Sequence, residues 1–194
     1  MLHIAQPPLS LSLSTQHRDL KPDNLGFTVD GQLVLFDFGL AKLWRIEADE
    51  PRGEGRQLTG QTGSARYMAP EVAACQPYGA SSEVYSFCII LWQLLSHERP
   101  YAGLDMKGFQ RQVVHGGQRP PLKKSWPPQL SAMLADGWHA DPCVRPTMAE
   151  VCCKLQELIE ASTTPRSLRA GSSRQATPNA TPVATPRGVG VECD

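Results

Sequence analysis

The sequence HRDLKPDN at residues 17–24, together with DFG at residues 37–39, is the most informative feature of this chain. The first motif carries a carboxylate at Asp19, an ammonium group at Lys21 and an amide at Asn24, and the second begins with Asp37. A carboxylate can orient a hydroxyl group and a lysine can neutralise phosphate oxygens, while amide and carboxylate oxygens are ligands that Mg²⁺ prefers. These residue types in this order indicate a site for phosphoryl transfer.

The segment between the two motifs predicts a β-hairpin. Two short runs rich in apolar and β-prone residues, 25–29 and 32–36, flank Asp30-Gly31, a strong signal for a two-residue turn. Such a hairpin would bring the end of the first motif and the start of the second together. We therefore expect Asn24 and Asp37 to lie on the same side of the site.

Three further motifs follow: TGSARYMAPE at residues 62–71, an apolar helix over residues 82–95, and WHADPCVRP at residues 138–146. With these motifs the chain resembles the C-terminal lobe of a eukaryotic protein kinase over roughly residues 17–160. The details resemble the tyrosine-kinase-like branch of the Ser/Thr kinases. The resemblance implies a mainly α fold with a small β-hairpin (α+β), in which the N-terminal lobe is missing.

The resemblance also implies roles for the residues of the first two motifs. Asp19 would orient the substrate hydroxyl or accept its proton, and Lys21 would neutralise charge on the transferred γ-phosphate of ATP. Asn24 and Asp37 would hold Mg²⁺. The implied reaction transfers the γ-phosphate of ATP to Ser or Thr of a protein substrate.

The segment that ends in APE is expected to control this site. Ser64 would touch the catalytic Asp19, as a Thr or Ser does in the family. Arg18 marks kinases that are controlled by loop phosphorylation, since a guanidinium can bind a phosphate with two hydrogen bonds. Thr59 and Thr62 are the candidate acceptors for an upstream kinase, and ordinary polar loop residues are an equally good interpretation of either one.

Three residues have structural roles by resemblance. Glu71 and Arg145 would form a buried ion pair that ties the activation segment to the end of the lobe. Glu83 occupies the position of a family Asp that braces the backbone of the HRD motif. Cys88 replaces a usual Gly, and a small buried hydrophobe is the simpler interpretation than a reactive thiol.

The beginning of the chain departs from the family pattern. Residues 1–18 contain no Lys, Asp, Glu or Gly, so they supply neither a glycine-rich lid nor the lysine and glutamate that hold the ATP phosphates. We therefore expect the 194-residue chain alone to be inactive. Three hypotheses stay open: a kinase-family chain that is active only in a longer form, a catalytically inactive truncated kinase that acts as a substrate-docking or interaction module, and an incomplete gene model.

The sequence divides into three parts: an atypical segment 1–16, at best a short strand, the kinase-like region 17–160, and a Ser/Thr/Pro-rich tail 161–194 that we expect to be disordered. The tail repeats Ala-Thr-Pro at residues 176–178, 180–182 and 184–186, either a cluster of phosphorylation sites or a biased linker. Residues 40–61 predict a mobile loop. Helices are expected over 106–114, 129–137 and 147–160, the last with a Thr147–Glu150 capping box.

Composition excludes several classes of function. The 19 basic and 19 acidic residues balance, which argues against nucleic acid as a partner. The six cysteines show neither zinc-site nor disulfide spacing. The longest apolar run, residues 84–95, is too short for membrane insertion and predicts a helix buried in the core. Because residues 1–16 do not resemble the helix that precedes it in the family, we expect part of this helix to lack packing partners, which would leave side chains such as Trp92 and Leu95 exposed. Without a secretory pattern at the start, we expect a cytoplasmic, or nuclear, protein.

Overall fold

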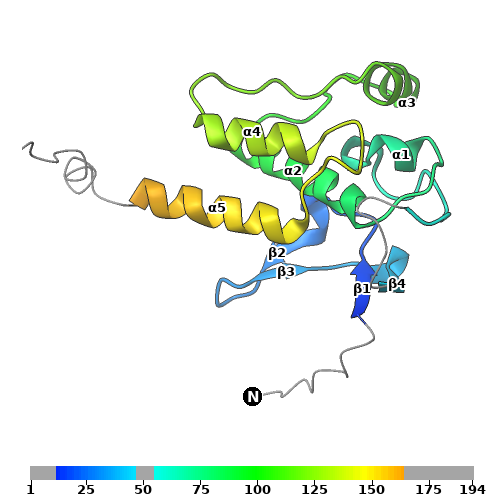
Figure 1. The fold of residues 1–194 in the computed structure, drawn as a ribbon, viewed down its shortest axis with the longest axis horizontal. Coiled ribbons are helices and arrows are strands. Elements are labelled where there is room, and N and C mark those ends of the chain that lie inside the picture. Colours follow the sequence, from blue (N-terminus) through cyan, green and yellow to red (C-terminus); the bar gives the residue numbers. More distant parts are fainter. Residues whose placement is uncertain (1–11, 47–54, 164–194) are drawn as a thin grey trace, which may run out of the picture.

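The computed structural model describes residues 12–46 and 55–163, with strands in the N-terminal part and helices in the rest (Figure 1). The strands are β1 (Ser12–Gln16), β2 (Leu25–Phe27), β3 (Leu33–Leu35) and β4 (Lys42–Ile46). The helices are α1 (Pro70–Ala73), α2 (Ala80–Ser96), α3 (Met106–Phe109), α4 (Pro128–Gly137) and α5 (Met148–Thr163). Short 3₁₀ turns are η1 (Pro22–Asn24), η2 (Phe38–Leu40) and η3 (Ala65–Tyr67), and η4 (Gln110–His115) is a π-helical turn.

Strands β2 and β3 form the predicted antiparallel hairpin, with Leu25 opposite Leu35. The turn is longer than the two residues expected. The Thr28 N–H donates to the Gln32 carbonyl at 2.9 Å, so three residues, 29–31, form the loop. Gly31 has φ of 83°, a left-handed conformation that glycine adopts without strain, and it sits at the position where three-residue hairpins require it.

Strands β1 and β4 pair antiparallel in a second two-stranded sheet, from Ser12 opposite Ile46 to Gln16 opposite Lys42. This sheet corrects the expectation of a single small hairpin in an otherwise helical fold. It also corrects the loop predicted for residues 40–61, of which 42–46 are strand and 47–54 lie outside the described residues. The loop prediction was drawn from Pro51, Gly53 and Gly55, which all follow the strand. The short strand allowed for residues 1–16 is present as β1.

Helix α2 is the centre of the core, as its apolar sequence predicts. Val84, Tyr85, Cys88 and Ile89 are each at most 2% exposed, and α4 packs on the same helix. Trp92 is also buried, at 2% exposure, and its indole N–H donates to the Pro121 carbonyl at 2.8 Å. The expectation that Trp92 lacks cover is therefore wrong.

The other predicted helices are present with small differences. The stretch expected at 106–114 is split into α3 and the π-helical turn η4. Helix α5 begins with the predicted capping box: the Glu150 carboxylate accepts from the Thr147 N–H at 2.7 Å, and the Thr147 hydroxyl accepts from the Glu150 N–H at 3.2 Å. The tail from residue 164 onward, with its Ala-Thr-Pro repeats, lies outside the described residues.

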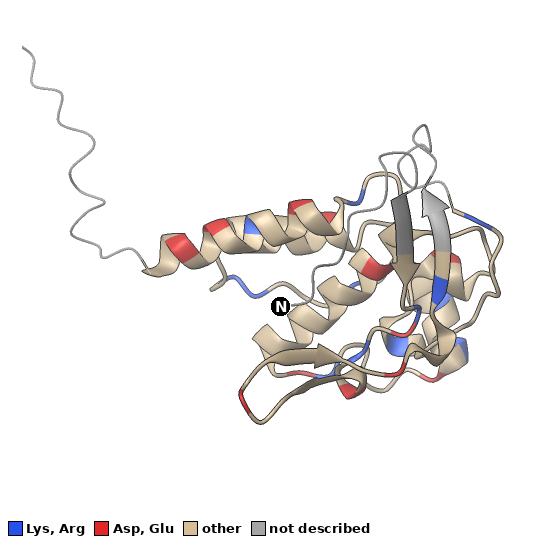
Figure 2. Ribbon diagram, turned by 90° about the horizontal axis from the view of Figure 1, so that it is seen from below, with Lys and Arg blue, Asp and Glu red and all other residues tan. Residues whose placement is uncertain are grey.

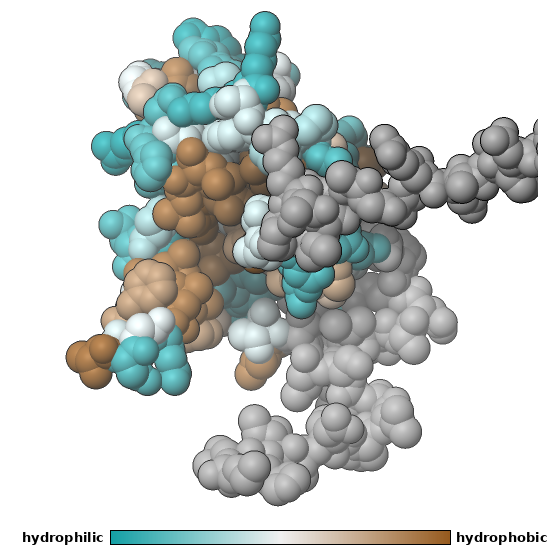
Figure 3. Space-filling view, turned by 90° about the vertical axis from the view of Figure 1, so that its left-hand side faces the viewer, coloured by the Kyte–Doolittle hydropathy of each residue, from teal (hydrophilic) through white to brown (hydrophobic). Residues whose placement is uncertain are grey.

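The surface of the described residues combines mixed charge with apolar areas. Acidic and basic residues are interspersed along the ribbon (Figure 2), whereas brown, apolar side chains gather on the face drawn in Figure 3. The hairpin contributes to the exposed apolar surface with Phe27 at 74% and Leu33 at 62%, and α2 contributes Leu94 at 60%. Within the described ranges, no helix has the length and apolar character needed to span a membrane.

Candidate active site

The turn that carries Asp19 is fixed from two sides. Its backbone is held by Glu83 of α2, whose Oε1 accepts from the His17 N–H and, at 2.9 Å, from the Arg18 N–H. The His17 ring contacts the Phe36 carbonyl at 2.7 Å, which connects this turn to the segment before Asp37. Glu83 therefore contacts both backbone amides, although its side chain is one methylene longer than that of the aspartate expected at this position. Burial raises the pKa of the Glu83 carboxyl group above its ordinary value.

Asp19 is buried and its carboxylate is held by neighbouring donors. Lys21 Nζ lies 2.6 Å from Oδ2, and the Ser64 N–H donates to Oδ1 at 2.8 Å. Burial by itself would raise the pKa of Asp19, but the hydrogen bonds from Lys21 and Ser64 outweigh it and lower the pKa below the ordinary value. The same contact raises the pKa of Lys21. Both groups are therefore charged at neutral pH.

Asn24 lies next to Asp19, and its backbone is hydrogen-bonded to the residue that precedes Asp37. The buried Asn24 amide donates to the Asp19 carbonyl at 2.9 Å, and the Asn24 carbonyl accepts from the Phe36 N–H at 2.8 Å. Asp37 is exposed, with φ of 56°, and its carboxylate accepts from the Gly39 N–H at 3.3 Å. The charge of Asp37 contributes to the raised pKa of Lys21, after the larger effect of Asp19.

The oxygen atoms of Asn24 and Asp37 fit a hard divalent cation. The side-chain nitrogen of Asn24 donates to Asp19, so the side-chain oxygen of Asn24 does not take part in that contact. The exposed Asp37 carboxylate accepts from Gly39 and can accept or coordinate further. Among the described residues there is no cluster of three or more His, Cys, Asp and Glu that could hold a metal by itself. Water molecules or the phosphate oxygens of a nucleotide would therefore have to complete the coordination.

Gly63 allows the loop that carries Ser64 to approach Asp19. It has φ of +95°, and a Cβ atom there would lie 2.5 Å from the Arg18 carbonyl and 3.1 Å from Asp19 Oδ1. A side chain at this position would push the loop away from the carboxylate. Ser64 is among the site residues predicted from the sequence and Gly63 is not, although a Thr-Gly-Ser sequence is itself a signal for a turn.

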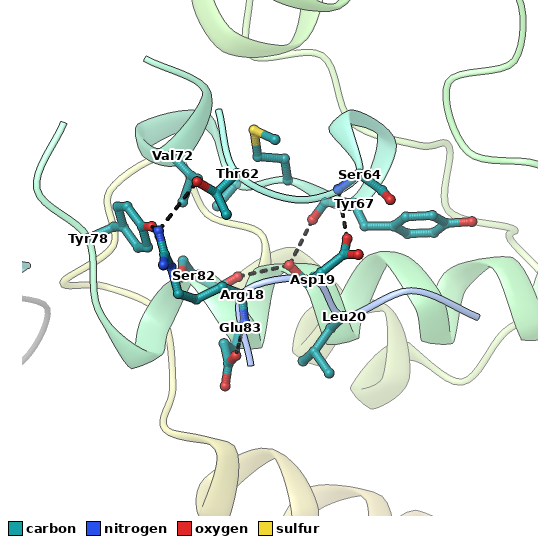
Figure 4. Close-up of a pocket in the computed structure, with 13 residues that line it drawn as sticks. Arg18, Asp19, Leu20, Thr62, Ser64, Tyr67, Val72, Tyr78, Ser82 and Glu83 are labelled. Atoms are coloured by element: carbon teal, nitrogen blue, oxygen red, sulfur yellow. Dashed lines mark hydrogen bonds between the residues drawn. The ribbon is translucent and has the colours of Figure 1, made fainter. Parts of the chain in front are cut away.

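Arg18 connects the turn that carries Asp19 to the segment with Thr59 and Thr62. Its guanidinium donates to Thr59 Oγ1 at 2.6 Å, to Thr62 Oγ1 at 3.3 Å and to the Leu40 carbonyl at 3.2 Å. It also donates twice to the hydroxyl of Tyr78, which sequence reasoning did not single out. Figure 4 shows Tyr78 and Thr62 beside Arg18, around a cavity of about 20 Å³, which is enough for one water molecule.

Glu71 and Arg145 form a bidentate ion pair away from the Asp19 carboxylate. The two distances are 2.6 Å and 2.8 Å, and both residues are at most 5% exposed. Arg145 also donates to the carbonyls of His139 and Ser81, at 2.9 Å and 3.1 Å. The pair links α1 to the segment before α5.

The sequence matches the protein kinase domain family over residues 12–155. It is 37% identical over 143 residues to serine/threonine-protein kinase STY17 of Arabidopsis thaliana, which covers 74% of this chain and 24% of the relative. It is 36% identical over 152 residues to serine/threonine-protein kinase TNNI3K of Rattus norvegicus, covering 77% and 17%. Dual specificity protein kinase shkB of Dictyostelium discoideum is 37% identical over 137 residues, covering 70% and 20%.

The family match begins at residue 12, so β1 and the strand-rich N-terminal part lie inside the matched domain. The prediction of a C-terminal lobe alone, with the N-terminal lobe missing, is wrong on this finding. The chain spans about a quarter or less of the length of these curated relatives.

Proposed function

The chain belongs to the protein kinase family, and from this premise we propose that it transfers the γ-phosphate of ATP to Ser or Thr residues of a protein substrate. The observation that carries the proposal is the buried Asp19 carboxylate, held between Lys21 Nζ at 2.6 Å and the Ser64 N–H at 2.8 Å. An ionised, oriented carboxylate beside a lysine is what the reaction needs at the attacking hydroxyl.

In the proposed reaction the substrate hydroxyl oxygen forms a bond to the γ-phosphorus while the bond to the bridging oxygen of ADP breaks. Asp19 orients the hydroxyl and takes its proton, and Lys21 neutralises charge on the transferred group. Asn24 and Asp37 would hold Mg²⁺, which would supply positive charge against the phosphate oxygens when bound. Ser64, hydrogen-bonded to Asp19 through its N–H, places the substrate-binding segment beside the acceptor site.

An upstream kinase belongs to the proposal as a partner, with Thr59 and Thr62 as its acceptors. Thr59 is exposed and both hydroxyls already lie within hydrogen-bond distance of Arg18. A phosphate on either residue would receive charge-assisted hydrogen bonds from the guanidinium.

The test is transfer of radiolabelled γ-phosphate to generic Ser, Thr and Tyr peptides by the purified chain. We expect label on Ser or Thr, lowered about 100-fold or more in Asp19→Asn and Asp37→Ala, because each removes a group that acts on the reacting atoms. The matched control is Asp30→Asn, which makes the same change in the exposed hairpin turn and should leave the rate unchanged. The proposal would be overturned if Asp37→Ala labels peptides as well as the wild-type chain does. It would also be overturned if the wild-type chain gives no more label than Asp37→Ala, and either result would favour a non-catalytic interaction module.

A further inference from the structure

Tyr78 lies between α1 and α2, and its side chain is only 2% exposed. Its hydroxyl oxygen accepts from Arg18 Nε at 2.8 Å and from a terminal guanidinium nitrogen of Arg18 at 2.5 Å. The same hydroxyl donates to the Thr59 carbonyl at 2.9 Å. A phenol has one proton and two acceptor positions, so these three contacts use its full capacity.

The backbone of Tyr78 holds the same segment at a second point. Its N–H and carbonyl exchange hydrogen bonds with Arg56, at 3.1 Å and 3.0 Å, in an isolated antiparallel bridge. Gly55 makes this approach possible, since a Cβ atom there would lie 2.2 Å from the Tyr78 nitrogen. One buried residue therefore fixes both ends of residues 55–59.

The charge of Arg18 is met by neutral groups in the described part of the chain. Its partners there are the Tyr78 hydroxyl, two carbonyls and two threonine hydroxyls, and the Tyr78 ring lies under the guanidinium at 5.6 Å from its centroid. Tyr78 is the acceptor for the Nε–H group and shares a terminal nitrogen with the threonines. Removing the hydroxyl would leave Nε–H, directly beside the catalytic turn, without its partner.

We propose that Tyr78 is a positioning residue that anchors residues 55–62 to the catalytic turn through Arg18. The neutral phenol supplies the acceptor that a phosphate on this segment would otherwise supply, so the segment is ordered before any modification. The consequence for turnover rests on the proposed kinase function. The anchoring itself does not, and it can be measured in the absence of activity.

The experiment compares the full chain with Tyr78→Phe, which removes the hydroxyl and keeps the ring. Amide hydrogen exchange is read at Arg56 and Gln61, whose N–H groups donate to the Tyr78 and Val72 carbonyls. Side-chain NMR reads the exchange of the Arg18 Nε–H group, assigned by its loss in Arg18→Lys. We expect the backbone amides of Arg56 and Gln61 and the Arg18 Nε–H group to exchange about 10- to 100-fold faster in Tyr78→Phe. A change of this size corresponds to the loss of one hydrogen bond to a charged group.

The matched control is Tyr101→Phe. It removes another buried phenol hydroxyl, which pairs with Tyr85 at 2.9 Å, and it does not touch Arg18. Exchange at Arg56, Gln61 and the Arg18 side chain should stay at the wild-type rate in this variant. Amides of α2 serve as the internal check that each variant is folded.

Unchanged exchange at Arg56 and Gln61 in Tyr78→Phe would overturn the proposal. If that variant does not fold, the wild-type chain decides instead, because an Arg18 Nε–H that exchanges as fast as an exposed arginine contradicts the anchoring. Where the wild-type chain phosphorylates a peptide, Tyr78→Phe should lower kcat and leave KM for ATP unchanged. If the wild-type chain transfers no phosphate, only the proposed function is refuted. The exchange rates still test the anchoring role of Tyr78 in that case.

Discussion

At the scale of single residues, Glu83 combines a structural role with an unfavourable charge. It braces the turn that carries Asp19 by accepting from the N–H groups of His17 and Arg18, yet burial raises the pKa of its carboxyl group. A carboxyl group with a raised pKa favours the folded state most when it is protonated. Its contribution to stability is therefore full below its ordinary value of 4.5 and is lost as pH rises through the folded-state pKa.

We predict that Glu83→Gln keeps the fold and melts at the same temperature as wild type or higher at pH 7. The amide oxygen can still accept from both backbone N–H groups, and it carries no charge to bury. The advantage should shrink as pH falls and vanish near pH 4, where the wild-type carboxyl group is itself protonated. Thermal melting of both proteins at several pH values makes the comparison.

The control is Glu83→Ala, which removes the acceptor and should lower the melting temperature at every pH. A Glu83→Gln chain that is less stable than wild type at pH 7, with a smaller deficit at pH 4, would show that the ionised carboxylate is the favourable form. The pKa of Glu83 would then be lowered by its two amide donors.

Single residues of the site were predictable where the motif fixes them. Asp19, Lys21 and Asn24 belong to one contiguous motif, so the side chains that lie together in the structure are also neighbours in the chain. Tyr78 could not be found in this way. Its contacts with Arg18 and Thr59 join residues 60 and 19 positions away, and a single tyrosine between Pro77 and Gly79 has no pattern that indicates such a partner.

At the scale of elements, the close packing of α2 on α4 depends on Gly137. A Cβ atom at this position would lie 2.2 Å from the Cys88 sulfur and 3.7 Å from a Val84 methyl group, closer to the sulfur than real contacts allow. Burial raises the pKa of the Cys88 thiol to about 12, so this sulfur is a packing atom rather than a reactive one.

We predict that Gly137→Ala destabilises the chain by about 1–3 kcal/mol, because the added methyl group overpacks the interface of the two helices. In the double variant with Cys88→Ala, one heavy atom is removed from α2 for the one added to α4, and the cost should be at least about 1 kcal/mol less than the sum of the single changes. Urea denaturation of the four proteins gives this coupling energy. Additive costs would show that the two helices do not touch at these positions.

The elements themselves were predictable in proportion to how local their determinants are. The capping box of α5, the hairpin and the apolar run of α2 each lie within one short segment, and all three are present. The sheet of β1 and β4 was missed because neither strand is convincing without its partner, about 30 residues away. Strand β4 was not predicted because residues 42–46 were treated as one segment with the Pro- and Gly-containing residues that follow them.

At the scale of the whole molecule, distant parts of the chain are tied together by Glu71 and Arg145. The two residues are 74 positions apart, and their bidentate contact is almost fully excluded from solvent. Arg145 further binds two carbonyls, and its guanidinium lies 5.2 Å from the centroid of the Tyr85 ring. The pair therefore connects α1, α2 and the segment before α5 at one point.

We predict that Glu71→Ala or Arg145→Ala alone costs about 3–5 kcal/mol, since each leaves a buried charge without its partner. This loss is a large part of the stability of a typical domain, which is about 5–15 kcal/mol. Replacing both residues with Met should cost less than the sum of the two single changes, because no charge is then left buried. The exposed pair of Lys154 and Asp136, at 3.6 Å, is the control, and Lys154→Met should cost at most about 1 kcal/mol. Chemical denaturation of each variant decides the matter: single variants at Glu71 and Arg145 that are as stable as Lys154→Met would show that the core does not depend on this ion pair.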